Sequence, residues 1–530
     1  MHGDDKFAQA ARLYDGVGNF ELGDGRTVRD ACRLVGNVSL WDCLSTYLIL
    51  YRFPMCVSGG AGLAHSYTER VRPLLGTLAR VRDTVLFPPS YTVQGLTQST
   101  PKSGHIRVLF VGFSEVFFRD VLRSVYSALE KESAGYQSIV LTGAGYGRRP
   151  QNHFSVWDYF SADVKAAATR GLSALDELKQ ALPGAIAAKR GAHLDGIAVD
   201  WPILRREFSW LCNRELPRLI YVAAAAYKVL SHYTPTLIVT ADDADQKSKV
   251  VELAARELRT PTLVVQQGVT RADYPDWKHF AGDYVAAMGP TSLETIVGQG
   301  VPREAVTVTG HPGLDKLKQA SEQENAATRA AQQVDPDEFL VIFASQPYYL
   351  GTFSSRRARR EMIRACLEAV STIPGVRLIV KAHPRDDVPA LKKLCANYPR
   401  IRIVDSQVEV ASLIKACDAF ITMFSQTTLE ALYADKPVIN INFPGSGVKS
   451  PFFDGKATCL AESREDIRIA ITKLSEGDYG FFQNHDNRFA KEKMLNEWTF
   501  LNDGKATDRV VDLISGICAS RVSEQRHTIA

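Results

Sequence analysis

A short basic loop follows a predicted β-strand in the second half of the chain. The apolar run 377–381 predicts the strand, and Lys381, His383, Pro384 and Arg385 lie at its carboxyl end. Ammonium, imidazole and guanidinium groups donate hydrogen bonds to phosphate oxygens, and the proline stiffens the turn. The loop therefore predicts phosphate binding, although a basic turn without a function has the same composition.

Hydroxyl side chains gather after a second predicted strand, 419–422. The residues there are Ser425, Gln426, Thr427 and Thr428, followed by Glu430 inside a predicted helix, 427–434. Hydroxyls and free backbone N–H groups at a helix start favour an anion. We expect a nucleotide phosphate at this point and a ribose hydroxyl at Glu430. The alternative is plain N-capping, with Glu430 complementing the helix dipole.

Two further polar segments follow predicted strands. Ser345 and Gln346 end the strand 339–344, where they are expected to meet a nucleotide base or phosphate, or to form a turn. His311 follows the strand 305–309 within a Gly-His-Pro-Gly sequence. This histidine is expected either to contact a phosphate or to belong to an inter-domain hinge.

Carboxylates follow a strand in the first half of the chain. Asp242 and Asp243 come directly after the strand 236–240, and either is a candidate general base for an acceptor hydroxyl. N-capping of the next helix is the alternative. Glu115 is the next candidate base, followed by Asp273 and Asp276.

The elements that position these residues form two cycles of alternating strands and helices. Strands are expected at 107–112, 138–142, 236–240, 261–265, 283–288 and 305–309, and again at 339–344, 377–381, 401–404, 419–422 and 437–441. Such alternation predicts an α/β fold with two Rossmann-like domains facing across a cleft. The expected boundaries are an N-terminal accessory segment 1–100, an acceptor domain 101–325, a nucleotide-donor domain 326–495, and a helical segment 496–530 that packs back on the first domain.

Composition and charge exclude several classes of protein. The chain has 530 residues, 45% of them hydrophobic and 23% charged, which fits a folded protein of two or more domains. A net charge of +4 does not indicate a nucleic-acid partner. No transmembrane or signal segment is predicted, so a cytoplasmic location is expected. Nine cysteines without a CxxC pair predict reduced thiols and no zinc site.

From Arg107 to Arg509 the chain resembles the GT-B glycosyltransferase superfamily, in particular bacterial surface-polysaccharide transferases of the polysialyl-, Kdo- and CDP-glycerol-transferase type. His383-Pro384 is similar to the HP motif of those families, and the segment 425–428 is similar to their Ser-Ser/Thr motif. Asp242-Asp243 resembles their carboxylate motif, with Ala244 in the place of its glycine.

The resemblance implies transfer of an acidic sugar, such as Kdo or sialic acid, from a CMP-linked donor to a hydroxyl of a capsule or lipopolysaccharide glycan. The implied partners are the nucleotide sugar and a glycan or lipid-linked glycan, with peripheral membrane association left open. The oligomeric state is not predicted, and no cofactor or metal is expected. A UDP-GlcNAc 2-epimerase and a catalytically inactive scaffold of a polysaccharide assembly complex are the alternatives.

Overall fold

The computed structural model describes residues 3–57, 94–131, 135–143, 150–189, 193–194, 196–241, 243–272, 274–319, 321–348, 353–405 and 407–529. The chain forms two compact units. The first unit contains residues 1–288, 292–312 and 507–530, and the second contains 289–291 and 313–506. The observed divisions at 312/313 and 506/507 differ from the boundaries 325/326 and 495/496 expected from the sequence.

Seven parallel strands form the sheet of the first unit, in the order β5-β4-β3-β6-β7-β8-β9. Their bounds are β3 Ile106–Gly112, β4 Tyr136–Thr142, β5 His153–Ser155, β6 Leu237–Thr240, β7 Thr262–Val265, β8 Tyr284–Ala287 and β9 Val306–Val308. Counted from β3, the order is 3-2-1-4-5-6-7, which is the doubly wound arrangement of Rossmann folds. The strand order reverses between β3 and β6.

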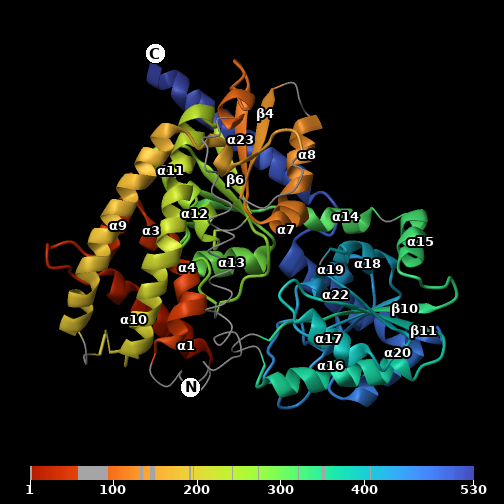
Figure 1. Cartoon of the computed structure of the whole chain (residues 1–530). Coiled ribbons are helices and arrows are strands. Elements are labelled where there is room, and N and C mark those ends of the chain that lie inside the picture. The colour runs from red at the N-terminus through yellow and green to blue at the C-terminus, as the bar shows by residue number, and fades with distance from the viewer. Residues whose placement is uncertain are drawn as a thin grey trace. The chain divides into compact units, whose positions relative to one another are not determined.

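Alternate residues of these strands face two different helical layers (Figure 1). Leu109 and Val111 of β3 pack with α9 (Ala162–Lys189), α11 (Leu216–Tyr233) and α12 (Gln246–Glu257). Val108 and Phe110 pack with α8 (Arg123–Lys131) and α23 (Ala506–Ile529). Both faces are therefore buried, as the uninterrupted apolar strands require.

Residues from 10 to 57 share the core of the first unit. Tyr14 stacks on Trp41 with ring centroids 5.1 Å apart. Arg52, which is 4% exposed, pairs with Glu207, which is fully buried. This part of the N-terminal segment contains α1 Gly3–Gly18, α2 Val28–Ala31, β1 Arg33–Val35, β2 Val38–Ser39, α3 Leu40–Cys43 and α4 Ser45–Tyr47.

Six parallel strands form the sheet of the second unit, in the order β12-β11-β10-β13-β14-β15. Their bounds are β10 Phe339–Ala344, β11 Val376–Lys381, β12 Ile401–Val404, β13 Ala419–Thr422, β14 Val438–Ile441 and β15 Cys459–Ala461. Counted from β10, the order is 3-2-1-4-5-6, so the strand order reverses between β10 and β13. The expected α/β fold with two Rossmann-like domains is confirmed by these two strand orders.

Several helices pack against one face of this second sheet. Val341 and Phe343 of β10 share a core with Ile363 and Leu367 of α16 (Arg356–Ser371) and with Ile471 of α20 (Arg464–Ser475). The other helices are α14 Asp315–Lys318, α15 Glu322–Ala331, α17 Val388–Cys395, α18 Val410–Ala416, α19 Thr427–Tyr433, α21 Gly480–Gln483 and α22 His485–Thr499. The first unit also contains α6 Gln94–Gln98, α7 Glu115–Phe117 and α10 Trp201–Trp210, and α13 is Pro290–Gly298.

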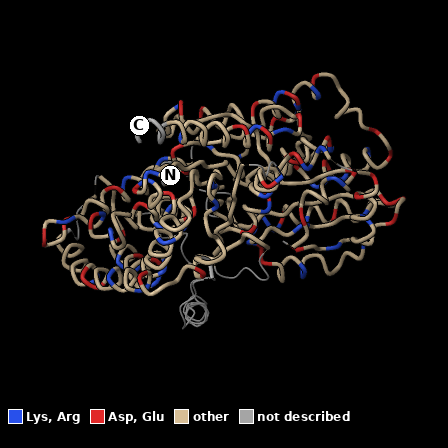
Figure 2. The backbone as a smooth tube through the Cα atoms, turned by 90° about the horizontal axis from the view of Figure 1, so that it is seen from above, with Lys and Arg blue, Asp and Glu red and all other residues tan. Residues whose placement is uncertain are grey.

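Basic and acidic residues are interspersed along the backbone of both units (Figure 2). Within the residues that the structure describes, no helix is both long and apolar enough to cross a membrane.

Candidate functional site

Three of the predicted polar segments follow adjacent strands of the second unit. β11, β10 and β13 are neighbours in the sheet, and their carboxyl ends lead into Lys381, Ser345 and Phe424 respectively. Ligands of doubly wound sheets bind outside the carboxyl ends of the strands, where the strand order reverses. We therefore refer to the segments 345–346, 381–386 and 424–428 as the switch-point site.

Gln346 joins two of these segments across the point of reversal. Its Oε1 accepts a hydrogen bond of 2.9 Å from the backbone N–H of Phe424. Ser345 Oγ donates to Asp386 Oδ2, which joins the first segment to the loop after β11. Ser345 and Gln346 are only 4% and 5% exposed, so they hold the loops in place while presenting little surface to a ligand.

Arg359 and Asp386 form a partly buried ion pair at the loop after β11, and neither residue was predicted from the sequence. Their side chains are 16% and 1% exposed, and Arg359 Nη2 lies 2.5 Å from Asp386 Oδ1. Asp386 Oδ2 also accepts from the backbone N–H of His383 at 3.1 Å. Burial lowers the pKa of the Arg359 guanidinium, an effect that the Asp386 charge opposes. The carboxylate thus fixes the start of the His383 loop.

The surroundings of His383 favour a neutral imidazole with Nε2 as its donor. Burial lowers its pKa, and the charges of Arg385 and Lys381 lower it further against the opposing effect of Asp386. The backbone N–H of Arg385 donates to His383 Nδ1 at 3.1 Å. Because Nδ1 accepts this bond, the proton of the neutral ring lies on Nε2, which is then a hydrogen-bond donor.

The other residues of the basic loop differ in exposure. Lys381 is 8% exposed, and its Nζ donates to the backbone oxygens of Asp405 at 2.6 Å and Ala382 at 3.4 Å. This ammonium brings positive charge under the loop without reaching the surface. Pro384 and Arg385 are exposed.

The hydroxyls after β13 have three different environments. Ser425 Oγ accepts from the backbone N–H of Thr427 at 3.2 Å, which is a local capping contact. Thr428 is fully buried, and its Oγ1 lies 3.2 Å from Asn440 Oδ1. Thr427 Oγ1 is buried without a hydrogen-bond partner within the described part of the chain. Gln426 and Glu430 are half-buried. The contact with Asn440 favours a structural role for Thr428. The Thr427 hydroxyl, which has no partner among the described residues, is the one available to a ligand.

The predicted carboxylates of the first unit lie in separate environments. Asp243 is 4% exposed; its Oδ1 accepts from the backbone N–H of Ala281 at 2.9 Å, and its Oδ2 lies 3.1 Å from Lys249 Nζ. This buried pair favours a structural role. Asp242 and Asp273 lie outside the described residues. Glu115 is exposed on the first turn after β3, beside the point where that sheet reverses.

Asp276 and His311 follow β7 and β9 of the first unit. Burial raises the pKa of Asp276 to about 7, with a smaller contribution from the Asp243 charge, although Thr270 and Gln299 donate to the carboxylate. His311 is 5% exposed, and its Nε2 lies 3.3 Å from the Gln267 backbone oxygen. Within the described residues, no group of three or more His, Cys, Asp or Glu side chains is arranged to hold a metal ion.

Comparison with known protein families gives one match. Residues 281–515, less than half of the chain, match the family model of UDP-N-acetylglucosamine 2-epimerase rather than a sialyl- or Kdo-transferase model. Comparison with curated protein sequences found no match.

Solved structures with a similar fold include two epimerases and one polymerase. The UDP-GlcNAc 2-epimerase of Neisseria meningitidis, bound to UDP-GlcNAc, is 12% identical over 78% of this chain and 100% of its own, with a TM-score of 0.48. The UDP-GlcNAc 2-epimerase of Methanocaldococcus jannaschii is 13% identical over 78% and 99%, with a TM-score of 0.48. The wall teichoic acid polymerase TagF, solved with CDPG, is 12% identical over 86% and 99%, with a TM-score of 0.49. The fold described above rests on the strand orders of this chain and not on these likenesses.

Proposed function

We propose that the second unit binds a nucleoside-diphosphate sugar at the switch-point site and that the chain is an enzyme acting on this sugar, with 2-epimerisation of UDP-GlcNAc as its reaction. Two findings support the proposal: the match of residues 281–515 to the epimerase family model, and the chemistry of the switch-point site. The acidic, CMP-linked sugar expected from the sequence gains no support from the family comparison.

The observation that carries the proposal is the hydrogen bond from the Arg385 backbone N–H to His383 Nδ1, which leaves Nε2 of the neutral ring as a donor. A neutral imidazole with its proton on Nε2 can donate a hydrogen bond to a phosphate oxygen, although the ring itself carries no positive charge. The positive charge comes from the buried Lys381 ammonium beneath the loop. Such an arrangement suits a diphosphate, which needs both donors and nearby positive charge. Thr427 Oγ1 adds a donor that lacks a partner in the described residues.

C2 of the hexose is not next to a carbonyl, so loss of its proton has to be coupled to breaking the C1–O bond to UDP, which leaves a C1=C2 double bond. UDP then adds back to C1 while a proton returns to the opposite face of C2. At least one group that exchanges protons near neutral pH is therefore needed. In the first unit, Asp243 is paired with Lys249, so the predicted bases that stay open are Asp242, Glu115, Asp273 and Asp276. In the second unit, Glu430 follows the hydroxyl segment and stays a predicted ribose contact.

Glycosyl transfer is the second candidate function. It is favoured by the order of the His383-Pro384 and Ser425–Thr428 segments, which is similar to that of the cytidine-nucleotide transferases named above. In this reaction the acceptor hydroxyl loses its proton to a carboxylate while the site stabilises the leaving phosphate. The two candidates differ in nucleotide preference and in the need for an acceptor.

Calorimetric titration with UDP, CDP and CMP separates the candidates. We expect UDP to bind at least about tenfold more tightly than CMP, and we expect proton NMR to detect the C2 epimer of UDP-GlcNAc without an added acceptor. Preference for CMP or CDP with no epimer would favour transfer. A chain that binds none of the three nucleotides would be a scaffold.

His383→Ala tests the proposed contact, with His485→Ala as the matched control in the same unit. His485 has a side chain that is 88% exposed, on α22. Loss of a hydrogen bond to a charged phosphate is expected to weaken UDP binding by about tenfold or more in His383→Ala only. Equal UDP affinity in both variants would remove His383 from the site.

A further inference from the structure

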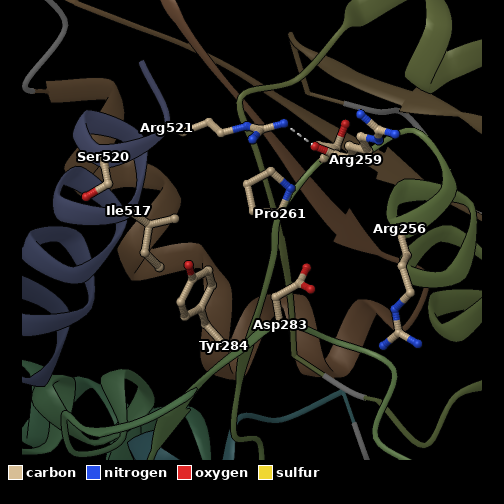
Figure 3. Close-up of a pocket in the computed structure, with 9 residues that line it drawn as sticks. Arg256, Arg259, Pro261, Asp283, Tyr284, Ile517, Ser520 and Arg521 are labelled. Atoms are coloured by element: carbon tan, nitrogen blue, oxygen red, sulfur yellow. Dashed lines mark hydrogen bonds between the residues drawn. The ribbon is translucent and has the colours of Figure 1, made fainter. Parts of the chain in front are cut away.

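A basic pocket lies at the amino-terminal edge of the first unit's sheet, at the opposite ends of the strands from Asp243 and His311. Residues just before β7 and at the start of β8 form its floor, and α12 and α23 contribute its walls (Figure 3). The pocket has a volume of about 230 Å³. Neither the proposed reaction nor the switch-point site uses it.

Three guanidinium groups and one carboxylate line this pocket: Arg256, Arg259 and Arg521, with Asp283. Asp283 Oδ2 is already the acceptor for the backbone N–H and the hydroxyl of Thr262, at 2.9 and 2.8 Å. Of the described residues, none forms an ion pair with Arg256 or Arg259. By residue type, three arginines and one aspartate give the lining a formal charge of +2.

Backbone oxygens hold two of the three arginines in place. Arg256 Nη2 donates to Ala281 O at 2.5 Å, and Arg521 Nη2 donates to Arg259 O at 2.5 Å. Figure 3 shows the second bond as a dashed line from α23 to the turn after α12. A guanidinium has five N–H donors, so the one backbone contact of Arg256 leaves most of its donors for another acceptor.

Arg259 occupies a backbone position that suits glycine. Its φ is +54°, and it ends α12: Arg259 N–H donates to Arg256 O at 3.1 Å, and Thr260 N–H donates to Ala255 O at 2.9 Å. Helices commonly end in this way with glycine, because a side chain in the left-handed region is strained. The chain places an exposed guanidinium here instead, which indicates that the side chain has a use beyond ending the helix.

We propose that this pocket binds a phosphate monoester. At neutral pH such a group carries a charge of nearly −2, which balances the formal charge of the lining, and its oxygens match the planar forks of arginine. Tyr284, which is 37% exposed, and Ile517 provide an apolar wall for the carbon atoms next to the phosphate. A free sugar or glycerol phosphate and a phosphatidate headgroup both carry this chemistry.

Arg259→Gly gives a sharp test, because it removes the guanidinium while relieving the backbone strain. Inorganic phosphate is titrated calorimetrically into the full chain as wild type, Arg259→Gly and Arg256→Gln, with Arg123→Gln as the control. Arg123 is an exposed arginine of α8 in the same unit. We expect phosphate affinity to fall about tenfold in each pocket variant and to stay unchanged in the control. The melting temperature of Arg259→Gly is expected to equal or exceed that of the wild type.

Phosphate that binds elsewhere in the chain contributes equally to the titrations of all four proteins, so it does not affect the differences between them. Equal phosphate affinity in Arg259→Gly and wild type overturns the proposal, as does acetate binding as tightly as phosphate. Co-sedimentation with phosphatidylcholine vesicles, with and without phosphatidate, then shows whether the phosphate group belongs to a lipid headgroup or to a soluble molecule. Phosphatidate-dependent binding that is lost in Arg259→Gly assigns the site to a lipid headgroup, and vesicle binding unaffected by the variant assigns it to a soluble phosphate.

Discussion

Thr427 and Thr428 are adjacent in the sequence, but their hydroxyls have different surroundings. Thr428 Oγ1 contacts Asn440, whose amide also donates to Phe452 O and Thr458 Oγ1 at 3.0 Å each. Thr427 Oγ1 is buried without a partner in the described residues. The first hydroxyl therefore stabilises the fold, and we expect the second to contact the nucleotide.

Replacement of each threonine by valine, which has nearly the same shape, separates these roles. Thr428→Val leaves a buried amide oxygen unpaired, so we expect the free energy of unfolding to fall by about 1 to 3 kcal/mol with UDP affinity unchanged. Thr427→Val is expected to weaken UDP binding while its stability is maintained. Urea unfolding and calorimetric titration of both variants check this. Thr427→Val with normal UDP affinity would contradict a nucleotide contact.

Asp276 and His279 are expected to give opposite contributions to the dependence of stability on pH. The pKa of Asp276 is raised to about 7, so between pH 4 and 7 the folded state keeps a proton that the unfolded state has lost, and stability falls as pH rises. Burial lowers the pKa of His279 to about 4. The unfolded state then binds the extra proton between pH 4 and 6.5, so this contribution to stability falls as pH falls.

Asp276→Asn isolates the first of these contributions, because asparagine keeps an acceptor for Thr270 and does not ionise. We expect the variant to gain roughly 2 to 4 kcal/mol over the wild type between pH 4.5 and pH 8, most of it below pH 7. Urea unfolding at four pH values in this range measures the difference. If the two stability curves run parallel, the carboxyl group of Asp276 titrates normally.

At the scale of the element, the loop after β11 depends on the partly buried pair of Arg359 and Asp386. Asp386→Asn removes the counter-charge of a guanidinium that is only 16% exposed. We expect the free energy of unfolding to fall by about 3 kcal/mol or more, because the remaining charge is buried and unpaired. UDP affinity is also expected to fall, since the carboxylate fixes the backbone of His383.

The matched control lies on the same helix. Arg357 and Glu361 form an exposed pair with side chains 87% and 53% exposed, so Glu361→Gln is expected to cost less than about 1 kcal/mol. The double variant Arg359→Met/Asp386→Asn is expected to regain stability, but not UDP affinity. Full recovery of UDP binding in the double variant would show that the pair does not position the loop.

Strongly periodic elements were predictable from the sequence. The strands 339–344, 401–404 and 419–422 have the predicted bounds. β15 and the helices α9 to α11 were not predicted. β15 has only three residues, and α9 contains many alanines and an internal Pro183, which blur the apolar period.

The contacts between side chains were harder to predict from the sequence than the ends of the strands. Sequence placed Ser345, His383 and Ser425 after strands that the structure makes neighbours. It did not identify Arg359 as the partner of Asp386, because α16 and the loop after β11 meet only through the tertiary fold. Lys249 is the fourth residue of α12, and nothing in its spacing indicates that it pairs with Asp243.

At the scale of the whole molecule, each unit has its own sheet and its own core. We expect differential scanning calorimetry to resolve two unfolding transitions. UDP at 100 times its dissociation constant is expected to raise the transition of the second unit by roughly 5 to 10 °C and to leave the other unchanged. A single transition that shifts as a whole would contradict independent unfolding.

The position of α23 in the chain has a consequence for synthesis. Val510, Ile514 and Cys518 of this helix cover the β3 face that carries Val108 and Phe110, yet the ribosome makes the whole second unit between the two. A nascent chain that has reached Ala506 can complete the second sheet while one apolar face of the first lacks a helix. Until α23 emerges from the exit tunnel, the part of this face that α23 covers stays exposed, and exposed apolar surface of this kind favours aggregation.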